Sequence, residues 1–399
     1  MPLDIDAVRA HYPALSEGFA HFDGAAGTLV AAPVADAVAA TLRGAVANRT
    51  DTFEPGRRAI RIVEEARAAV ADLVGAVAEG VAFGPSATAL TYTVARTLAA
   101  GWQPGDEVVV SQLDHDANVR PWVQAAEAAG ATVLWAKVDL ETGTLPADQY
   151  HQLVTDRTRL VAVTAASNVA GARPDVTAIS AIAHEAGALC YVDGVHATPH
   201  VPIDVAALGA DFYVTSAYKW SGPHIAACAA APELWKTLRP WKLVPSSDAV
   251  PERFEFGTPS FELLAGVTAA VDHLAALSPS EGSRRAQVLA SMDEIRAYEA
   301  SLFNDLLDGL ASIPGIWLCP AEGRRCPTVS FRLAGQSPAE TSRALGDQGI
   351  CLFSGDYYAA EYFGALGLRE SGGAVRAGIY HYTTAEEVQR LLEACQKLA

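Results

Sequence analysis

Short apolar segments alternate with helix-like segments through the first two-thirds of the chain, and this alternation limits the possible folds more than any other feature. The strand-like segments are 80–83, 107–111, 131–135, 160–164, 189–192 and, as the last of the series, 212–214. Segments 87–100, 121–129 and 176–186 have helical patterns. Apolar strands joined by helices pair into a mostly parallel sheet that is covered on both faces. The functional side chains of such a sheet lie at the carboxyl ends of its strands.

The pattern changes near residue 282. A long helical segment is expected at 283–310, and a second helix at 338–348 separates strand-like segments at 327–332 and 375–379. A further helical segment covers 384–398. This mixture predicts a small α+β domain. We therefore predict a large domain over residues 20–280 and a small domain formed by residues 1–19 and 281–399.

Composition and charge exclude several classes of protein. Half of the 399 residues are hydrophobic, which excludes a disordered chain. The net charge of −17 argues against nucleic acid and anionic membranes as partners. The six cysteines form no C-x-x-C pair, so neither a disulfide framework nor a metal site is predicted. The chain has neither a secretory signal nor an apolar stretch of membrane-spanning length, and we expect a cytoplasmic protein.

The densest group of chemically active residues surrounds Lys219, within segment 213–223. A lysine at a strand end in an apolar setting loses its proton readily and can form an imine, although a lone lysine is more often a surface residue. Asp193 follows the preceding buried strand. A buried carboxylate requires a cation, and a protonated pyridine nitrogen would serve. The alternative for Asp193 is an ordinary strand-to-turn junction.

Three further polar loops follow other strands. Ser86 and Thr88 lie between a strand and a helix start, where free backbone N–H groups and the helix dipole bind phosphate, or where Ser86 acts only as an N-cap. His115 could stack on an aromatic cofactor and move protons, or could be structural. Asn168 lies in the loop after another strand. We expect all these loops to meet Lys219 and Asp193 at one edge of the sheet.

With this series of loops in place, the chain resembles the class V aminotransferase family of fold-type I pyridoxal-5′-phosphate (PLP) enzymes, and within it the cysteine desulfurase-like proteins. The resemblance extends from segment 21–26 to the final helix and is most specific in segments 113–122 and 211–223. It implies a large domain with a mostly parallel seven-stranded sheet flanked by helices, and a small α+β C-terminal domain. It also implies PLP as the cofactor and an amino acid as the substrate.

The resemblance implies a role for each matching residue. Lys219 would hold PLP as a Schiff base and move the Cα proton of the substrate, Asp193 would pair with the pyridine nitrogen, and His115 would stack on the ring. Asn168 and His196 would lie near the ring hydroxyl. The residues implied to hold the phosphate are Ser86, Ala87, Thr88, Ser216 and Tyr218.

Two implied contacts involve other parts of the chain. Arg376 matches the arginine that binds the substrate α-carboxylate, a role suited to a planar guanidinium. Segment 253–259 resembles a segment that crosses to the neighbouring subunit, where Thr258 would contact the phosphate. A homodimer is therefore the implied functional unit.

One departure from the family concerns sulfur chemistry. Desulfurases carry a nucleophilic cysteine on a loop of the small domain, and this sequence has Tyr358 at the matching position. Tyr358 is instead a candidate substrate contact. Cys351 lies seven residues earlier on an expected strand, and we expect it to be buried. The segment 356–373 is expected to be a loop that forms either a substrate lid or a surface packed on the partner subunit.

These observations lead to one function and several alternatives. We expect a PLP-dependent lyase or transferase that removes the Cα proton of an amino acid and continues by desulfurase-like or C–S lyase chemistry, in which the leaving group departs by β-elimination. An amino-acid epimerase or racemase, or an aminotransferase, would use the same first step. From another class, the chain could be a non-catalytic PLP-binding scaffold in sulfur transfer.

Overall fold

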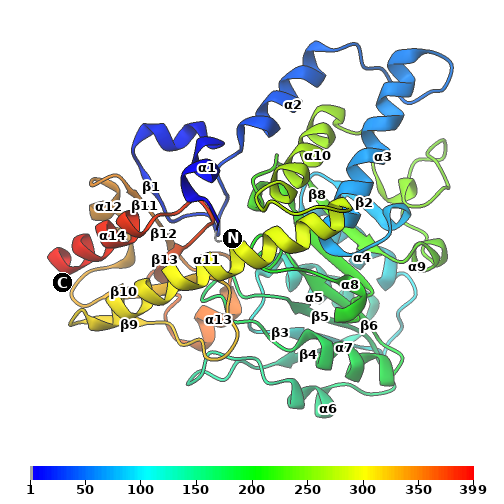
Figure 1. Ribbon diagram of the computed structural model, residues 1–399. Helices are drawn as coiled ribbons and strands as arrows, with labels where there is room; N and C mark the ends of the chain where they lie inside the picture. Colours follow the sequence, from blue (N-terminus) through cyan, green and yellow to red (C-terminus); the bar gives the residue numbers. More distant parts are fainter. Residues whose placement is uncertain (1–2) are drawn as a thin grey trace.

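The central element of the fold is a seven-stranded sheet in a computed structural model that describes residues 3–399 (Figure 1). The strands are β2 (Val81–Gly84), β3 (Glu107–Ser111), β4 (Thr132–Ala136), β5 (Thr158–Thr164), β6 (Leu189–Asp193), β7 (Phe212–Ser216) and β8 (Ala226–Ala230). Their order across the sheet is β2-β8-β7-β6-β5-β3-β4. Neighbours pair in parallel except for β8, which runs antiparallel to β2 and β7.

Successive residues of a strand point to opposite faces of the sheet, so both faces carry apolar side chains that must be buried. Helices cover both faces. Val108 and Val110 of β3 face one buried cluster, which includes Trp122 and Trp235, whereas Val109 faces the other. The helices of residues 32–275 are α2 (Ala32–Arg43), α3 (Glu54–Val74), α4 (Ala87–Ala99), α5 (Arg120–Ala129), α6 (Tyr150–Leu153), α7 (Val176–Glu185), α8 (Val205–Leu208), α9 (Pro232–Thr237) and α10 (Phe261–Ala275). With both faces covered, the polar loops that follow the strands are left at the edge of the sheet.

The six strands predicted from the sequence are confirmed, and the mostly parallel sheet with them. The expectation that 212–214 is the last strand is wrong, because β8 follows it. The sequence of β8, Ala-Ala-Cys-Ala-Ala, has no β-branched or aromatic residue to indicate a strand. Its small, fully buried side chains suit a position between β2 and β7 with helices on both faces.

The C-terminal part of the chain forms a second, smaller sheet. Its strands are β12 (Phe353–Gly355), β13 (Ala374–Gly378), β10 (Thr328–Leu333) and β9 (Ile316–Leu318), in that order and all antiparallel. The helices are α11 (Arg284–Ser312), α12 (Pro338–Gly346), α13 (Ala360–Ala365) and α14 (Ala385–Leu398). Figure 1 shows α11 running from the large sheet to the small one.

The N-terminal segment lies against the C-terminal part of the chain. After α1 (Ile5–Ala10), strand β1 (Ala20–His21) pairs in parallel with β11 (Ile350–Cys351). The domain boundaries at residues 20 and 280 stay a prediction. Within residues 3–399, no helix combines the length and apolar character that crossing a bilayer requires.

Two expectations for the small domain are corrected. Segment 356–373 is not simply a loop, because it contains α13, whose Tyr362 and Phe363 are fully buried in the core. Cys351 lies on β11 as expected, but it is only partly buried, since this two-residue strand pairs only with β1. The other five cysteines are buried.

Candidate active site

A pocket lies at the carboxyl edge of the large sheet, where the loops after five strands meet. These loops follow β2, β3, β5, β6 and β7, which places residues far apart in sequence beside one another. The lining residues are Ser86, Ala87, Thr88, His115, Ala117, Thr164, Ala166, Asn168, Asp193, Val195, His196, Ser216, Tyr218 and Lys219. The pocket therefore brings together all the predicted site residues except Thr258, Arg376 and Tyr358.

Lys219 lies in a 3-10 turn (Ala217–Lys219) directly after β7, and its side chain is almost fully buried. Its Nζ donates a hydrogen bond to the Ala25 carbonyl at 2.5 Å. Burial and, after it, the positive charge of Arg376 together lower the pKa of this amine to about 8, against the opposing effects of Asp193 and Asp23. A substantial fraction of the amine is therefore neutral and nucleophilic near neutral pH.

Asp193 ends β6 and is buried beside the pocket. One carboxylate oxygen accepts a hydrogen bond from the Val195 backbone N–H at 2.9 Å. Burial raises the pKa of Asp193, while this hydrogen bond and the charge of Lys219 act in the opposite direction. A carboxylate at this depth is stabilised by a cation in the pocket, such as a protonated ring nitrogen.

His115 lies on the loop after β3, and its ring is neutral. Burial and, after it, the charges of Lys219 and Arg376 together lower the pKa of His115 to about 3. Nδ1 accepts a hydrogen bond from the Ala117 backbone N–H at 3.0 Å, so the proton of the neutral ring is on Nε2. A neutral imidazole of fixed tautomer is suited to stacking on a flat ring and to donating a hydrogen bond.

Asn168 and His196 each present a buried polar atom that has no partner within residues 3–399, namely Asn168 Oδ1 and His196 Nδ1. Their remaining polar atoms are fixed, because Asn168 Nδ2 donates to the Tyr357 carbonyl at 2.9 Å and His196 Nε2 lies 3.0 Å from Thr328 Oγ1. Buried polar atoms are normally satisfied. Both side chains line the pocket, so a ligand with polar ring substituents fits it.

The start of α4 forms another part of the pocket wall. Ser86 is the N-cap of this helix, and its Oγ accepts a hydrogen bond from the Ala89 backbone N–H at 3.1 Å, which confirms the capping alternative. Capping leaves other backbone N–H groups of the first turn free to bind an anion. Tyr218 lies on the same pocket wall and stacks on His224 with the ring centroids 5.0 Å apart.

Arg376 lies on β13, outside the pocket lining but close to it. It is 3% exposed, its Nη1 donates to the Asn168 carbonyl at 3.0 Å, and its guanidinium lies 4.4 Å from the Tyr357 ring centroid. Its Nη2 is 3.6 Å from an Asp23 carboxylate oxygen, and its Nε has no partner within residues 3–399. The guanidinium can therefore still donate a hydrogen bond to a carboxylate.

Tyr358 is 72% exposed and lies beside the pocket. Its ring centroid is 5.5 Å from that of His115, and its carbonyl accepts a hydrogen bond from the Asp116 backbone N–H at 2.7 Å. Tyr357 and Tyr358 both have positive φ angles, of 50° and 59°. Two consecutive non-glycine residues with positive φ are strained, so the contacts of this turn with His115 and Asp116 are needed to stabilise it.

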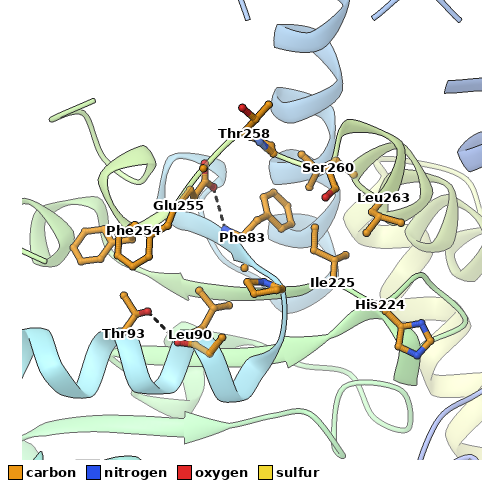
Figure 2. Close-up of a pocket in the computed structure, with 17 residues that line it drawn as sticks. Phe83, Leu90, Thr93, His224, Ile225, Phe254, Glu255, Thr258, Ser260 and Leu263 are labelled. Carbon is orange, nitrogen blue, oxygen red and sulfur yellow. Dashed lines mark hydrogen bonds between the residues drawn. The ribbon is translucent and has the colours of Figure 1, made fainter. Parts of the chain in front are cut away.

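Thr258 does not join Lys219 in this chain. It lines a separate cavity of about 330 Å³, whose walls are mainly apolar. Figure 2 shows Thr258 near Ser260 at one rim of this cavity, with Phe83 and Ile225 beneath them. Both cavities reach the start of α4, because Pro85 lines one and Ser86 lines the other.

Two residues that shape the site, Asp23 and Asp114, were not predicted from the sequence. Asp23 is the acidic neighbour of Arg376. It was not predicted as a site residue, although it lies in segment 21–26, where the family resemblance begins. Asp114, the residue before His115, is buried, accepts hydrogen bonds from Ser111 and from Asn118 Nδ2 at 2.7 Å, and has a pKa raised to about 8 by burial. The sequence signal for Asp114 is a run of polar residues directly after an apolar strand.

Comparisons with known proteins agree with this geometry. A family model described as "Aminotransferase class-V" matches residues 20–391. The "Uncharacterized protein MT3887" of Mycobacterium tuberculosis (strain CDC 1551 / Oshkosh) is 36% identical over the whole of both chains. A "Probable cysteine desulfurase" of Mycolicibacterium paratuberculosis is 32% identical over 99% of this chain, which spans 58% of that relative.

A solved structure extends the similarity to three dimensions. The apo structure of cysteine desulfurase from Thermococcus onnurineus NA1 has a TM-score of 0.90 and 26% sequence identity, and the match covers 100% of this chain and 98% of that one. The fold is therefore that of fold-type I PLP enzymes, as the resemblance implied, and members of the family use PLP. The chain belongs to the class V aminotransferase family.

Proposed function

We propose that the chain is a PLP-dependent enzyme that removes the Cα proton of an amino acid and then releases a leaving group from the β carbon, with a cysteine derivative as the model substrate. The observation that carries this proposal is the buried Lys219 amine with a lowered pKa, facing a pocket that also holds Asp193 and His115. Strongly shifted pKa values gather at functional sites, so a lowered pKa beside these groups favours a catalytic lysine over a structural one.

The pocket residues fit PLP, as the unpartnered Asn168 Oδ1 and His196 Nδ1 suggest. Lys219 would bind the cofactor covalently, and Asp193 would pair with its ring nitrogen. The phosphate would occupy the start of α4 together with Ser216 and Tyr218. When bound, PLP supplies an electron sink for the charge left on Cα.

The protein's own groups would then position the substrate and move one proton. The Arg376 guanidinium would bind the α-carboxylate, and its unpartnered Nε is available for that contact. The neutral Lys219 Nζ would take the Cα proton as a general base, since a pKa of about 8 suits proton transfer near neutral pH. His115 would cover one face of the site through its neutral ring.

Direct release of the leaving group is proposed because none of the pocket-lining residues is a cysteine. The position that matches the desulfurase nucleophile holds Tyr358, whose phenol cannot carry sulfur as a persulfide. Cys351 lies on β11, and burial raises the pKa of its thiol, which lowers its nucleophilicity at neutral pH. A sulfur-containing group would therefore depart as a free thiol or sulfide.

We also propose that the functional unit is a homodimer in the cytoplasm. Thr258 lines a cavity separate from the pocket of Lys219, which supports the idea that it serves the phosphate of a second copy. Sedimentation of the holoenzyme would give the mass of two chains. Thr258→Val would raise the dissociation constant of PLP in that dimer, whereas a monomeric species with full PLP affinity would contradict the proposal.

The decisive experiment is proton NMR of the holoenzyme with a panel of amino acids in D₂O, followed for loss of the Cα–H signal and for products. Pyruvate together with a freed thiol would establish elimination. Exchange without a new product would favour epimerisation, alanine would indicate desulfuration, and a keto acid that retains its side chain would indicate transamination.

Lys219→Ala is the matched control, because it removes the amine and leaves the other pocket side chains in place. All Cα–H exchange must disappear in this variant. If wild-type holoenzyme exchanges no amino acid, or if Lys219→Ala retains cellular function, the chain acts as a PLP-binding scaffold and the enzymatic proposal is wrong.

A further inference from the structure

A third cavity, of about 200 Å³, lies outside the active site, between α11 and the segment that precedes β10. Its lining includes His200, Glu299, Phe303 and Arg325. None of these four side chains lines the pocket of Lys219. The cavity is open to solvent on the side of Arg296, whose side chain is 57% exposed and pairs with the equally exposed Asp293 at 2.9 Å.

Arg325 is a partly buried cation without a carboxylate partner within residues 3–399. Its Nε donates to the Ala170 carbonyl and its Nη2 to the Thr328 carbonyl, both at 3.1 Å, and its guanidinium lies 4.9 Å from the Phe303 ring centroid. Burial lowers its pKa to about 10. A buried guanidinium is costly without an anion, and neutral carbonyls and an aromatic ring offset only part of that cost.

Two fully buried side chains, His200 and Glu299, are among the residues that line the cavity. His200 Nδ1 lies 2.8 Å from Glu299 Oε2, whereas His200 Nε2 has no hydrogen-bond partner within the described chain. Burial raises the pKa of Glu299 well above its ordinary value and lowers that of His200 to about 3. These two shifts favour a neutral pair, in which the Glu299 carboxyl donates to Nδ1 and the ring proton of His200 is on Nε2. Nε2 is then a buried donor without an acceptor.

We propose that this cavity binds a small oxyanion, a carboxylate or a phosphate, between Arg325 and His200. The guanidinium supplies charge and parallel donors, the imidazole supplies a further donor, and the neutral Glu299 does not repel the ligand. Arg296 at the rim can exchange its weak, exposed pair with Asp293 for the bound anion.

The site is connected to the active site through one loop. Arg325 donates to the Ala170 carbonyl, and its backbone forms a bridge with Ala172. Asn168, which presents an unpartnered atom to the PLP pocket, lies in the same loop. An anion that draws Arg325 away from Ala170 would remove a contact with the loop that carries Asn168.

Isothermal titration calorimetry of the holoenzyme with sodium acetate and with sodium phosphate tests this proposal, with sodium chloride used to keep the ionic strength constant. We expect saturable binding of at least one of the two anions at one site per chain, and the tighter of the two identifies the ligand class. Arg325→Gln should raise the dissociation constant at least about tenfold, as expected for loss of a charge-assisted hydrogen bond. The exposed neighbour Arg324 provides the control, because Arg324→Gln removes the same charge and should leave the constant within about twofold.

Crystals of the wild-type holoenzyme soaked in bromide give a readout that does not depend on a variant folding. An anomalous peak in contact with Arg325 and His200 would support the site. A cavity that holds only water, or anion binding that is equally tight in Arg325→Gln, would overturn it. Acetate that binds only at Arg376 would also overturn the proposal, because that binding would be equally tight in Arg325→Gln.

Discussion

The lowered pKa of Lys219 gives the sharpest quantitative prediction. At pH 7 an amine with a pKa of about 8 is about 9% neutral, whereas an ordinary lysine with a pKa of 10.5 is about 0.03% neutral. Lys219 should therefore react with PLP about 300 times faster than a free lysine of ordinary pKa, at equal intrinsic nucleophilicity. The increase comes from burial first and from Arg376 second.

The assay follows covalent attachment of PLP to the stripped protein by visible absorbance, as a function of pH. N-acetyl-lysine methyl amide, measured in parallel, corrects for the titration of PLP itself. The corrected rate should rise with pH and level off above a midpoint near 8. Lys219→Ala should abolish the signal.

The sign of two further shifts follows from the charges around the amine. Arg376→Gln removes a positive charge that lowers the pKa, so the midpoint should move up. Asp193→Asn removes a negative charge that raises the pKa, so the midpoint should move down. A wild-type midpoint near 10.5, or shifts of the opposite sign in these variants, would refute the electrostatic account of Lys219.

Three other predictions concern cofactor affinity and stability. Asp193→Asn should weaken PLP binding at least about tenfold in equilibrium dialysis, because it removes the carboxylate proposed to pair with the ring nitrogen, and unchanged affinity would exclude that role. Trp235→Ala should lower the free energy of unfolding in urea by about 3–5 kcal/mol, since Trp235 is fully buried, whereas the 87%-exposed Trp241→Ala should change it by less than about 0.5 kcal/mol. Burial raises the pKa of Glu299, so its contribution to stability is present at low pH and is lost as pH rises through the folded-state pKa. Glu299→Gln should therefore gain stability relative to wild type as pH rises, and a melting-temperature difference that is constant with pH would contradict this.

Much of the large domain is predictable from the sequence because buried parallel strands are short apolar runs, such as 107–111 and 160–164. The same rule predicts that polar residues directly after these runs meet at one edge, and His115, Asn168, Asp193 and Lys219 do line one pocket. Strand β8 is not predictable in this way, because its alanines carry no preference for a strand.

Contacts between the domains are harder to infer from sequence patterns. The pairing of Arg376 with Asp23 and the hydrogen bond between Asn168 and the Tyr357 carbonyl depend on how the small domain packs against the large one. Strand and helix periodicity describes each segment separately and contains no information on such packing. The roles of Thr258 and Tyr358 stay predictions for the same reason.

The long sequence separation of these contacts has a consequence for synthesis on the ribosome. Asn168 contacts Tyr357, which lies 189 residues later, and Arg376, which lies 208 residues later. Every strand of the large sheet has therefore been translated before either partner exists. Since Arg376 helps to lower the pKa of Lys219, the amine should be more fully protonated and less reactive in a nascent chain until the C-terminal strand β13 is in place. Translation order thus delays full reactivity of the amine until the group proposed to bind the substrate carboxylate is present.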